Sequence, residues 1–184
     1  MAYQARTSKT HPIEVGWLEE GRLGLTFAPG KRASSLSGPP WERDLRADLG
    51  RLVEHHGARL LVSLVEDHEL VSLHIPDLVA ACQQAALEVI RFPIVDGSVP
   101  HDLGAVQQLV ETITLRVRGG STVVVHCRGG LGRAGTIGGC SLAGLGKTPE
   151  QIFTMLFAAR GKNCPENDAQ RDFIRRFARA RGAA

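Results

Sequence analysis

The stretch STVVVHCRGGLGRAGT, residues 121–136, decides how the rest of the chain is interpreted. Its valines form an unbroken apolar run, which is typical of a strand buried on both faces of a parallel sheet. Cys127 ends this run, a glycine-rich arc follows, and helical periodicity predicts a helix from Arg133 to Leu145. Because α/β proteins bind ligands at the carboxyl ends of their strands, the stretch predicts a functional loop between this strand and this helix.

Aliphatic runs and helical periodicities alternate on both sides of this stretch. Two apolar stretches within residues 13–27 predict a hairpin or a pair of short edge strands, and a loop is predicted over 28–40. Further strands are predicted at 59–65 and 88–95. The predicted helices lie at 41–57, 76–87, 101–120, 149–160 and 166–180. This order indicates an α/β fold with a mostly parallel central sheet flanked by helices.

Composition indicates one compact domain. A length of 184 residues with 43% apolar residues suits a single domain over 1–184, with a core of about 12–178. The net charge of +3 suits phosphorylated ligands but indicates no nucleic-acid partner, and none is expected. No segment approaches the roughly 18 to 20 apolar residues that span a bilayer, so we expect a soluble, cytoplasmic protein that does not bind membranes. The four cysteines form no CxxC pair, which predicts reduced thiols and no metal site.

The arc between strand and helix has the features of an anion-binding cup. Its glycines allow a tight turn with the backbone N–H groups pointing inward, and the following helix N-terminus adds partial positive charge. The same field stabilises a thiolate, so Cys127 is expected to be a nucleophile. Arg133 can give two parallel hydrogen bonds to phosphoryl oxygens. The expected substrate-binding residues are Arg128, Gly129, Gly130, Leu131, Gly132 and Arg133, with Arg128 and Leu131 contributing mainly backbone N–H groups.

The segment HCRGGLGR resembles the HC-x5-R signature of the cysteine-dependent protein tyrosine and dual-specificity phosphatases. The resemblance continues through WERDLRADL, LVSLVEDHEL, RFPIVDGSVP and NDAQRDFIRRF, covers about residues 12–178, and is strongest to the kinase-associated branch of the family. It implies a three-layer protein tyrosine phosphatase-like fold and hydrolysis of phosphotyrosine, phosphoserine or phosphothreonine through a cysteinyl-phosphate intermediate. It also implies a phosphorylated protein or peptide partner, with a kinase as one option, and no cofactor or metal.

Such a mechanism needs a general acid to protonate the leaving oxygen. Asp96 follows the predicted strand 88–95, whose end should neighbour that of Cys127 in a parallel sheet, and the resemblance places the acid there as well. Asp102 is the alternative, but it stands where a helix begins and is better suited to an N-cap. Asp96 is therefore favoured, and its Asp-Gly sequence can form a turn at the same time.

Three residues near the loop are expected in supporting roles. The resemblance assigns His126 to holding the loop by hydrogen bonds and Gln170 to positioning water, although a glutamine on a polar helix face is usually solvated. Thr136 lies in the first turns of the predicted helix. Ala134 departs from the family pattern, because many members have Ser or Thr there, whose hydroxyl stabilises the leaving thiolate. Thr136 is about 200° further around the helix and should not replace that hydroxyl.

Two alternatives remain open at this point. A pseudophosphatase would bind a phosphorylated partner in the cup without turnover, and Ala134 is the residue that favours this interpretation. A rhodanese-like sulfurtransferase also uses a cysteine in a strand-loop-helix cup. Its loop is typically one residue shorter, however, with Arg or Thr where this chain has Gly132. Loop length therefore favours phosphate chemistry.

Overall fold

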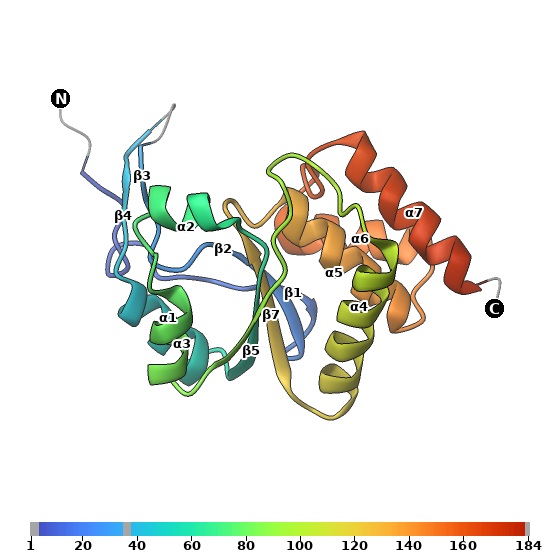
Figure 1. Cartoon of the computed structure of the whole chain (residues 1–184), viewed down its shortest axis with the longest axis horizontal. Coiled ribbons are helices and arrows are strands. Elements are labelled where there is room, and N and C mark those ends of the chain that lie inside the picture. The colour runs from blue at the N-terminus through green and yellow to red at the C-terminus, as the bar shows by residue number, and fades with distance from the viewer. Residues whose placement is uncertain (1–3, 35–37, 183–184) are drawn as a thin grey trace.

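The computed structural model describes residues 4–34 and 38–182, which pack around a five-stranded sheet (Figure 1). The strand order is β1-β2-β7-β5-β6. β1 is antiparallel to β2, and all other pairs are parallel. The strands are β1 (Gly16–Glu19), β2 (Leu23–Phe27), β5 (Ala58–Ser63), β6 (Glu88–Arg91) and β7 (Thr122–Cys127). The predicted α/β class and mostly parallel sheet are confirmed.

The central position of β7 explains its unbroken run of valines. Every residue of this strand is buried, with β2 on one side and β5 on the other. Val123 and Val125 belong to one apolar core, and Val124 faces a second core on the opposite side of the sheet. A strand covered on both faces has no position for a solvent-exposed side chain, so the usual polar alternation is absent.

Helices cover both faces of the sheet (Figure 1). Those that contact the face of the second core are α1 (Leu45–Glu54) and α3 (Leu78–Gln84), and α2 (Asp67–Ser72) follows the end of β5. The other face carries α4 (Leu103–Arg118), α5 (Gly132–Gly144), α6 (Pro149–Arg160) and α7 (Asp168–Gly182). A capping residue explains where α6 begins: the Thr148 side chain accepts a hydrogen bond from the Gln151 N–H, and the first helical residue is Pro149.

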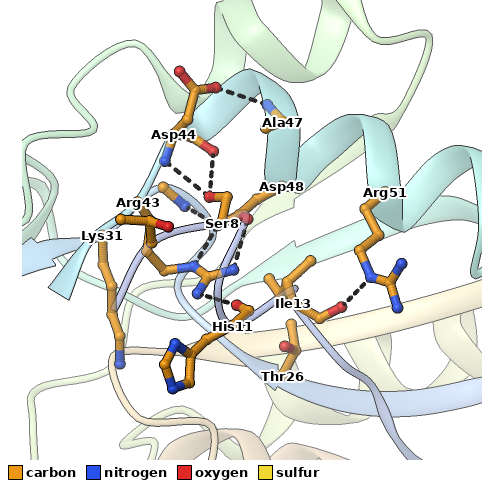
Figure 2. Close-up of polar contacts among 12 residues, drawn as sticks. Ser8, His11, Ile13, Thr26, Lys31, Arg43, Asp44, Ala47, Asp48 and Arg51 are labelled. Atoms are coloured by element: carbon orange, nitrogen blue, oxygen red, sulfur yellow. Dashed lines mark hydrogen bonds and ion pairs between the residues drawn. The ribbon is translucent and has the colours of Figure 1, made fainter. Parts of the chain in front are cut away.

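The region before α1 differs from the sequence-based expectation. Trp41 does not start a helix but forms a short antiparallel ribbon of β3 (Arg32–Ala33) and β4 (Trp41–Glu42). The helix starts four residues later, because the Asp44 carboxylate accepts a hydrogen bond from the Ala47 N–H at 2.8 Å. Figure 2 shows this cap and the polar network beside it, in which Arg43 binds Asp48 through two hydrogen bonds of 2.7 and 2.8 Å.

Two further expectations need correction. The hairpin at residues 13–27 exists, but β2 is not an edge strand, since it pairs with β1 and β7. The six-residue helix α2 was not predicted, because a helix this short has too few positions for an apolar period to be recognised.

Candidate active site

Four connections that leave the carboxyl ends of parallel strands meet at one edge of the sheet. They follow β2, β5, β6 and β7, and they surround a cavity of about 330 Å³. Sequence analysis placed Cys127 and Asp96 in one site, and the structure brings both to this cavity. Its lining residues are Lys31, Ala33, Ser34, Trp41, Leu73, Asp96, Cys127, Arg128, Gly129 and Glu166. The position agrees with the general rule for ligand sites in open α/β sheets.

The loop after β7 curls around the thiol of Cys127. The Gly130 N–H donates a hydrogen bond to Cys127 Sγ at 3.2 Å, and α5 begins at Gly132 on the same loop. Gly130 has φ +74°, and a Cβ there would lie 2.5 Å from the backbone of Thr26. Only glycine fits this position without moving β2, so the end of β2 forms one wall of the loop. Cys127 is 3% exposed, and that exposure faces the cavity.

The carbonyl groups of the same loop accept hydrogen bonds from two cations. Lys31 Nζ, at the cavity, donates to the Arg128 carbonyl at 3.4 Å. Arg160 at the end of α6 donates through Nη2 to the Gly129 carbonyl and through Nε to the Gly130 carbonyl, both at 3.0 Å. These bonds fix the course of the loop backbone, as an anion cup of N–H groups requires. Neither cation was singled out from the sequence, because each reaches the loop from a distant segment.

Arg133 is 1% exposed and is surrounded by acceptors. Its Nη1 donates to Glu69 at 2.5 Å and to the Ile94 carbonyl at 2.9 Å. Its Nη2 donates to the other Glu69 oxygen at 2.8 Å and lies 2.8 Å from Asp96 Oδ1. The Nε–H has no hydrogen-bond acceptor among the residues described by the structure. Nε and Nη2 lie on one edge of the guanidinium, so this edge can hold two phosphoryl oxygens once Asp96 moves aside.

Glu69 is a further residue of this site that was not predicted from the sequence. It is 2% exposed on α2, and its carboxylate also accepts a hydrogen bond from the Glu66 N–H at 2.9 Å. Burial acts to raise the pKa of Glu69, but the hydrogen bonds from Arg133 and Glu66 outweigh it and hold the pKa below its ordinary value. Glu69 is therefore an anion that orients Arg133. The available signal was weak, because a Glu three residues after Glu66 is equally explained by a capping box.

The two candidate acids have different environments. Asp96 has a side chain that is 60% exposed at the cavity, pairs with Arg133, and also accepts from the Gly97 N–H at 3.1 Å. Asp96 therefore forms the Asp-Gly turn and lies at the cavity at the same time. Asp102 accepts from the Ala105 N–H at 2.9 Å and is the N-cap of α4, as expected.

The three supporting residues all lie close to the loop, at buried positions. His126 Nδ1 donates to the Cys127 carbonyl at 3.4 Å, and burial lowers the pKa of His126 to about 4, so its ring is neutral at pH 7. Thr136 Oγ1 donates to the Gly132 carbonyl at 2.9 Å within the first turn of α5. Gln170 is fully buried rather than solvated: its Nε2 donates to the Ser98 carbonyl at 3.2 Å, and its Oε1 accepts from the Glu166 N–H at 3.1 Å.

Glu166 is a second carboxylate at the cavity that the sequence did not reveal. A Cβ placed on Gly132 would lie 2.1 Å from Glu166 Oε2, so this carboxylate rests against the backbone of the catalytic loop.

The other three cysteines are free, buried thiols. Burial raises the pKa of Cys82 and of Cys164 to about 12 and the pKa of Cys140 further still, so these three thiols stay protonated at neutral pH.

The site combines a cysteine at a strand end, a loop whose Gly130 N–H donates to the thiol, and a buried arginine, which are the parts of a cysteine-dependent phosphatase. Comparison with known proteins agrees. Residues 42–179 match the family model described as PTP-SAK: Swiss Army Knife protein, DSP-PTPase phosphatase domain. The chain belongs to this family, and it is a protein phosphatase of the tyrosine and dual-specificity class, whose members act through a cysteinyl-phosphate intermediate.

Individual relatives support the same assignment. Cyclin-dependent kinase inhibitor 3 from Homo sapiens is 27% identical over 174 residues, which cover 90% of this chain and 79% of the human protein. Its counterpart from Rattus norvegicus is 26% identical over the same length. The crystal structure of kinase associated phosphatase (KAP) with its catalytic cysteine replaced by serine superposes with a TM-score of 0.81 at 25% identity, covering 94% of this chain and 98% of that one. Tk-PTP in its active form shares the fold, with a TM-score of 0.71 at 23% identity and coverage of 90% and 96%.

Two features are absent from residues 4–34 and 38–182. No helix there is both long and apolar enough to cross a bilayer. No group of three His, Cys, Asp or Glu side chains in these segments is arranged to hold a metal ion.

Proposed function

We propose that this single-domain phosphatase cleaves phosphate monoesters on proteins with Cys127 as nucleophile, Arg133 as phosphoryl clamp and Asp96 as general acid. The observation that carries the proposal is the shared cavity: Cys127 Sγ and Asp96 both line it, and the Nη2 of Arg133 touches the Asp96 carboxylate. The substrate-binding N–H groups are those of residues 128–132 on the same loop.

The reaction has two chemical steps. In the first, the Cys127 thiolate attacks phosphorus, an S–P bond forms, the P–O bond to the substrate breaks, and Asp96 gives its proton to the leaving oxygen. In the second, water attacks phosphorus while Asp96 takes a proton from it, the S–P bond breaks, and the thiolate is restored. Arg133 and the loop N–H groups stabilise the charge on the equatorial oxygens in both transition states.

The second step is proposed to be slow. Ala134 is buried in the core and offers no hydroxyl to the departing thiolate. Thr136 already donates its hydroxyl hydrogen to the Gly132 carbonyl, which agrees with the expectation that it does not take over this role. Gln170 is proposed to position the attacking water; its side chain is held by hydrogen bonds to the Ser98 carbonyl and from the Glu166 N–H.

The proposed partner is a phosphorylated protein, and a phosphorylated kinase is the first candidate. This rests on the likeness to proteins whose names refer to cyclin-dependent kinases and to kinase association. We further propose a cytoplasmic location, because all four cysteines are free and a nucleophilic thiol must stay reduced.

The proposal is tested by assaying p-nitrophenyl phosphate and a panel of phosphotyrosine, phosphoserine and phosphothreonine peptides in the presence of EDTA. We expect continued turnover, because the loop N–H groups and Arg133 supply the charge stabilisation. A burst of one equivalent of p-nitrophenol without further turnover would instead identify a phosphate-binding pseudophosphatase, in which the second step has failed.

Replacement of the general acid separates the two aspartates. We expect Asp96→Ala to lower kcat for a peptide substrate on the order of 10²- to 10⁴-fold, because its leaving group must be protonated as it departs. Asp102→Ala removes a helix cap and should cost about 1 kcal/mol of stability with little loss of rate. Rates on phosphopeptides and thermal unfolding of both variants check this. A larger rate loss for Asp102→Ala than for Asp96→Ala would reassign the acid.

A further inference from the structure

Lys31 is a buried cation that no carboxylate neutralises. It is 8% exposed, and within the described residues its ammonium forms no ion pair. The nearby Asp48 carboxylate is occupied by other donors: it binds Arg43 through both oxygens and accepts from the Gly30 N–H at 2.8 Å, so it does not pair with Lys31. Figure 2 shows the Lys31 side chain running past Arg43, with its ammonium directed away from Asp48. Because burial of an unpaired ammonium costs free energy, its position requires another source of stabilisation.

Two aromatic rings and one carbonyl hold this ammonium at the cavity. Nζ lies 4.5 Å from the centre of the Trp41 ring and 4.6 Å from that of Phe27, which are cation–π distances. It also donates to the Arg128 carbonyl on the catalytic loop. Phe27 is the residue of β2 that pairs with Cys127 of β7 in the sheet. The rings therefore fix the ammonium beside the strand end that carries the thiol.

Of the charged groups that act on Lys31 in the described structure, Cys127 is the one with the sign of a counter-ion. Burial, followed by the charge of Arg43 from the segment before α1, lowers the pKa of Lys31 to about 8. The cations Arg128 of the catalytic loop and Arg160 of α6 act in the same direction. Cys127, which also lies on the loop, acts in the opposite direction and favours the charged ammonium. The two carboxylates that line the same cavity, Asp96 and Glu166, form no ion pair with Lys31 in the described structure.

Arg133 alone cannot balance an ionised thiol. Its guanidinium is held by two hydrogen bonds to the buried Glu69 carboxylate, which already balances its single positive charge. A thiolate at Cys127 is therefore stabilised by further cations that form no ion pair in the described structure. Arg160 and the exposed Arg128 are two of these, and Lys31 is the buried one that lines the cavity.

We propose that Lys31 is the counter-ion of the Cys127 thiolate and thereby a positioning residue that keeps the nucleophile ionised. The proposal rests on the role of Cys127 proposed above. It adds a specific dependence on pH: the ammonium is charged below pH 8 and loses its proton as the pH rises through about 8. The contribution of Lys31 to the thiolate is thus present at neutral pH and is lost in the alkaline range.

The experiment compares the rate at which iodoacetamide alkylates Cys127 in the wild type, Lys31→Met, Lys31→Arg and Lys147→Met. Lys147 pairs with Glu19 at 2.9 Å and does not line the cavity, so it is the matched lysine control. At pH 6 we expect alkylation of Lys31→Met to be about tenfold slower, the effect of losing one close opposite charge. At pH 9 its rate should equal that of the wild type, whose Lys31 is then neutral. Lys31→Arg and Lys147→Met should match the wild type at pH 6.

A second measurement covers the case in which Lys31→Met does not fold. Lys31→Gln, which keeps a polar side chain of similar length, should move the pH at which Cys127 alkylation rises about one unit upward. Lys31→Arg should leave that pH at the wild-type value, because a guanidinium stays protonated. A wild-type alkylation rate in folded Lys31→Met at pH 6, or alkylation of Lys31→Gln that rises at the wild-type pH, would overturn the proposal. If Cys127 were not the nucleophile, the result would be different: Cys127→Ser would hydrolyse substrate at the wild-type rate.

Discussion

Replacement of Cys127 by serine is expected to abolish turnover of p-nitrophenyl phosphate, with a loss of more than about 10⁴-fold. A serine hydroxyl stays protonated in the same loop, because the loop N–H groups and nearby cations stabilise a thiolate far more readily than an alkoxide. The cup itself is unchanged, since the N–H groups come from the backbone. Initial rates should therefore show that hydrolysis is lost, whereas fluorescence anisotropy should show that the variant still binds a phosphopeptide.

Cys82→Ala is the matched control for this substitution. Cys82 is a buried thiol on α3, on the opposite face of the sheet from α5, and it does not line the cavity. We expect its variant to keep wild-type activity with a lower melting temperature. Normal hydrolysis by Cys127→Ser would show that another group attacks phosphorus.

The second large effect is expected for Arg133→Lys, which should lower kcat by about 10³- to 10⁵-fold. An ammonium is a point charge and cannot hold Glu69 along one edge while presenting a second edge to a phosphoryl group. Part of the loss is also expected from Glu69, whose buried carboxylate would keep only part of its hydrogen bonding. Steady-state rates at saturating substrate, together with thermal unfolding, measure the two consequences.

Arg43→Lys provides the comparison for stability. Arg43 is also 1% exposed, and it binds the Asp48 carboxylate through two hydrogen bonds, as Arg133 binds that of Glu69. The two variants should therefore lose stability to a similar extent, whereas only Arg133→Lys should lose most of its catalytic rate. Equal rate losses in both would mean that the effect of Arg133→Lys arises from unfolding rather than from the phosphoryl clamp.

The sequence was informative where the chemistry is contiguous. The strand end, the thiol, the glycine arc and Arg133 lie within one stretch of the chain, so spacing alone placed them together. Asp96 could be located because parallel strands end at a common edge, and the cavity contains it. Asp102 was correctly separated as a helix cap, since its position at a helix start has a local signal.

The residues around this stretch were not predicted, and the reason is physical. The loop and Arg133 are contacted from distant segments: by Glu69 on α2, by Lys31 after β2 and by Arg160 at the end of α6. Nothing in the local sequence of these residues distinguishes them from capping or surface residues. Gln170 was expected on a solvated face, but packing of α7 over α5 buries it. Trp41 was assigned to a helix because its spacing to later leucines fits a helical period, whereas its ring covers Lys31.

The family match begins at residue 42, after β2 has ended. The backbone behind Gly130, one of the two strands that pair with β7, and the Phe27 ring beside the Lys31 ammonium all lie in the earlier segment. A fragment that began at residue 42 would therefore lack one side of the catalytic loop, even though it would contain every residue of the family match.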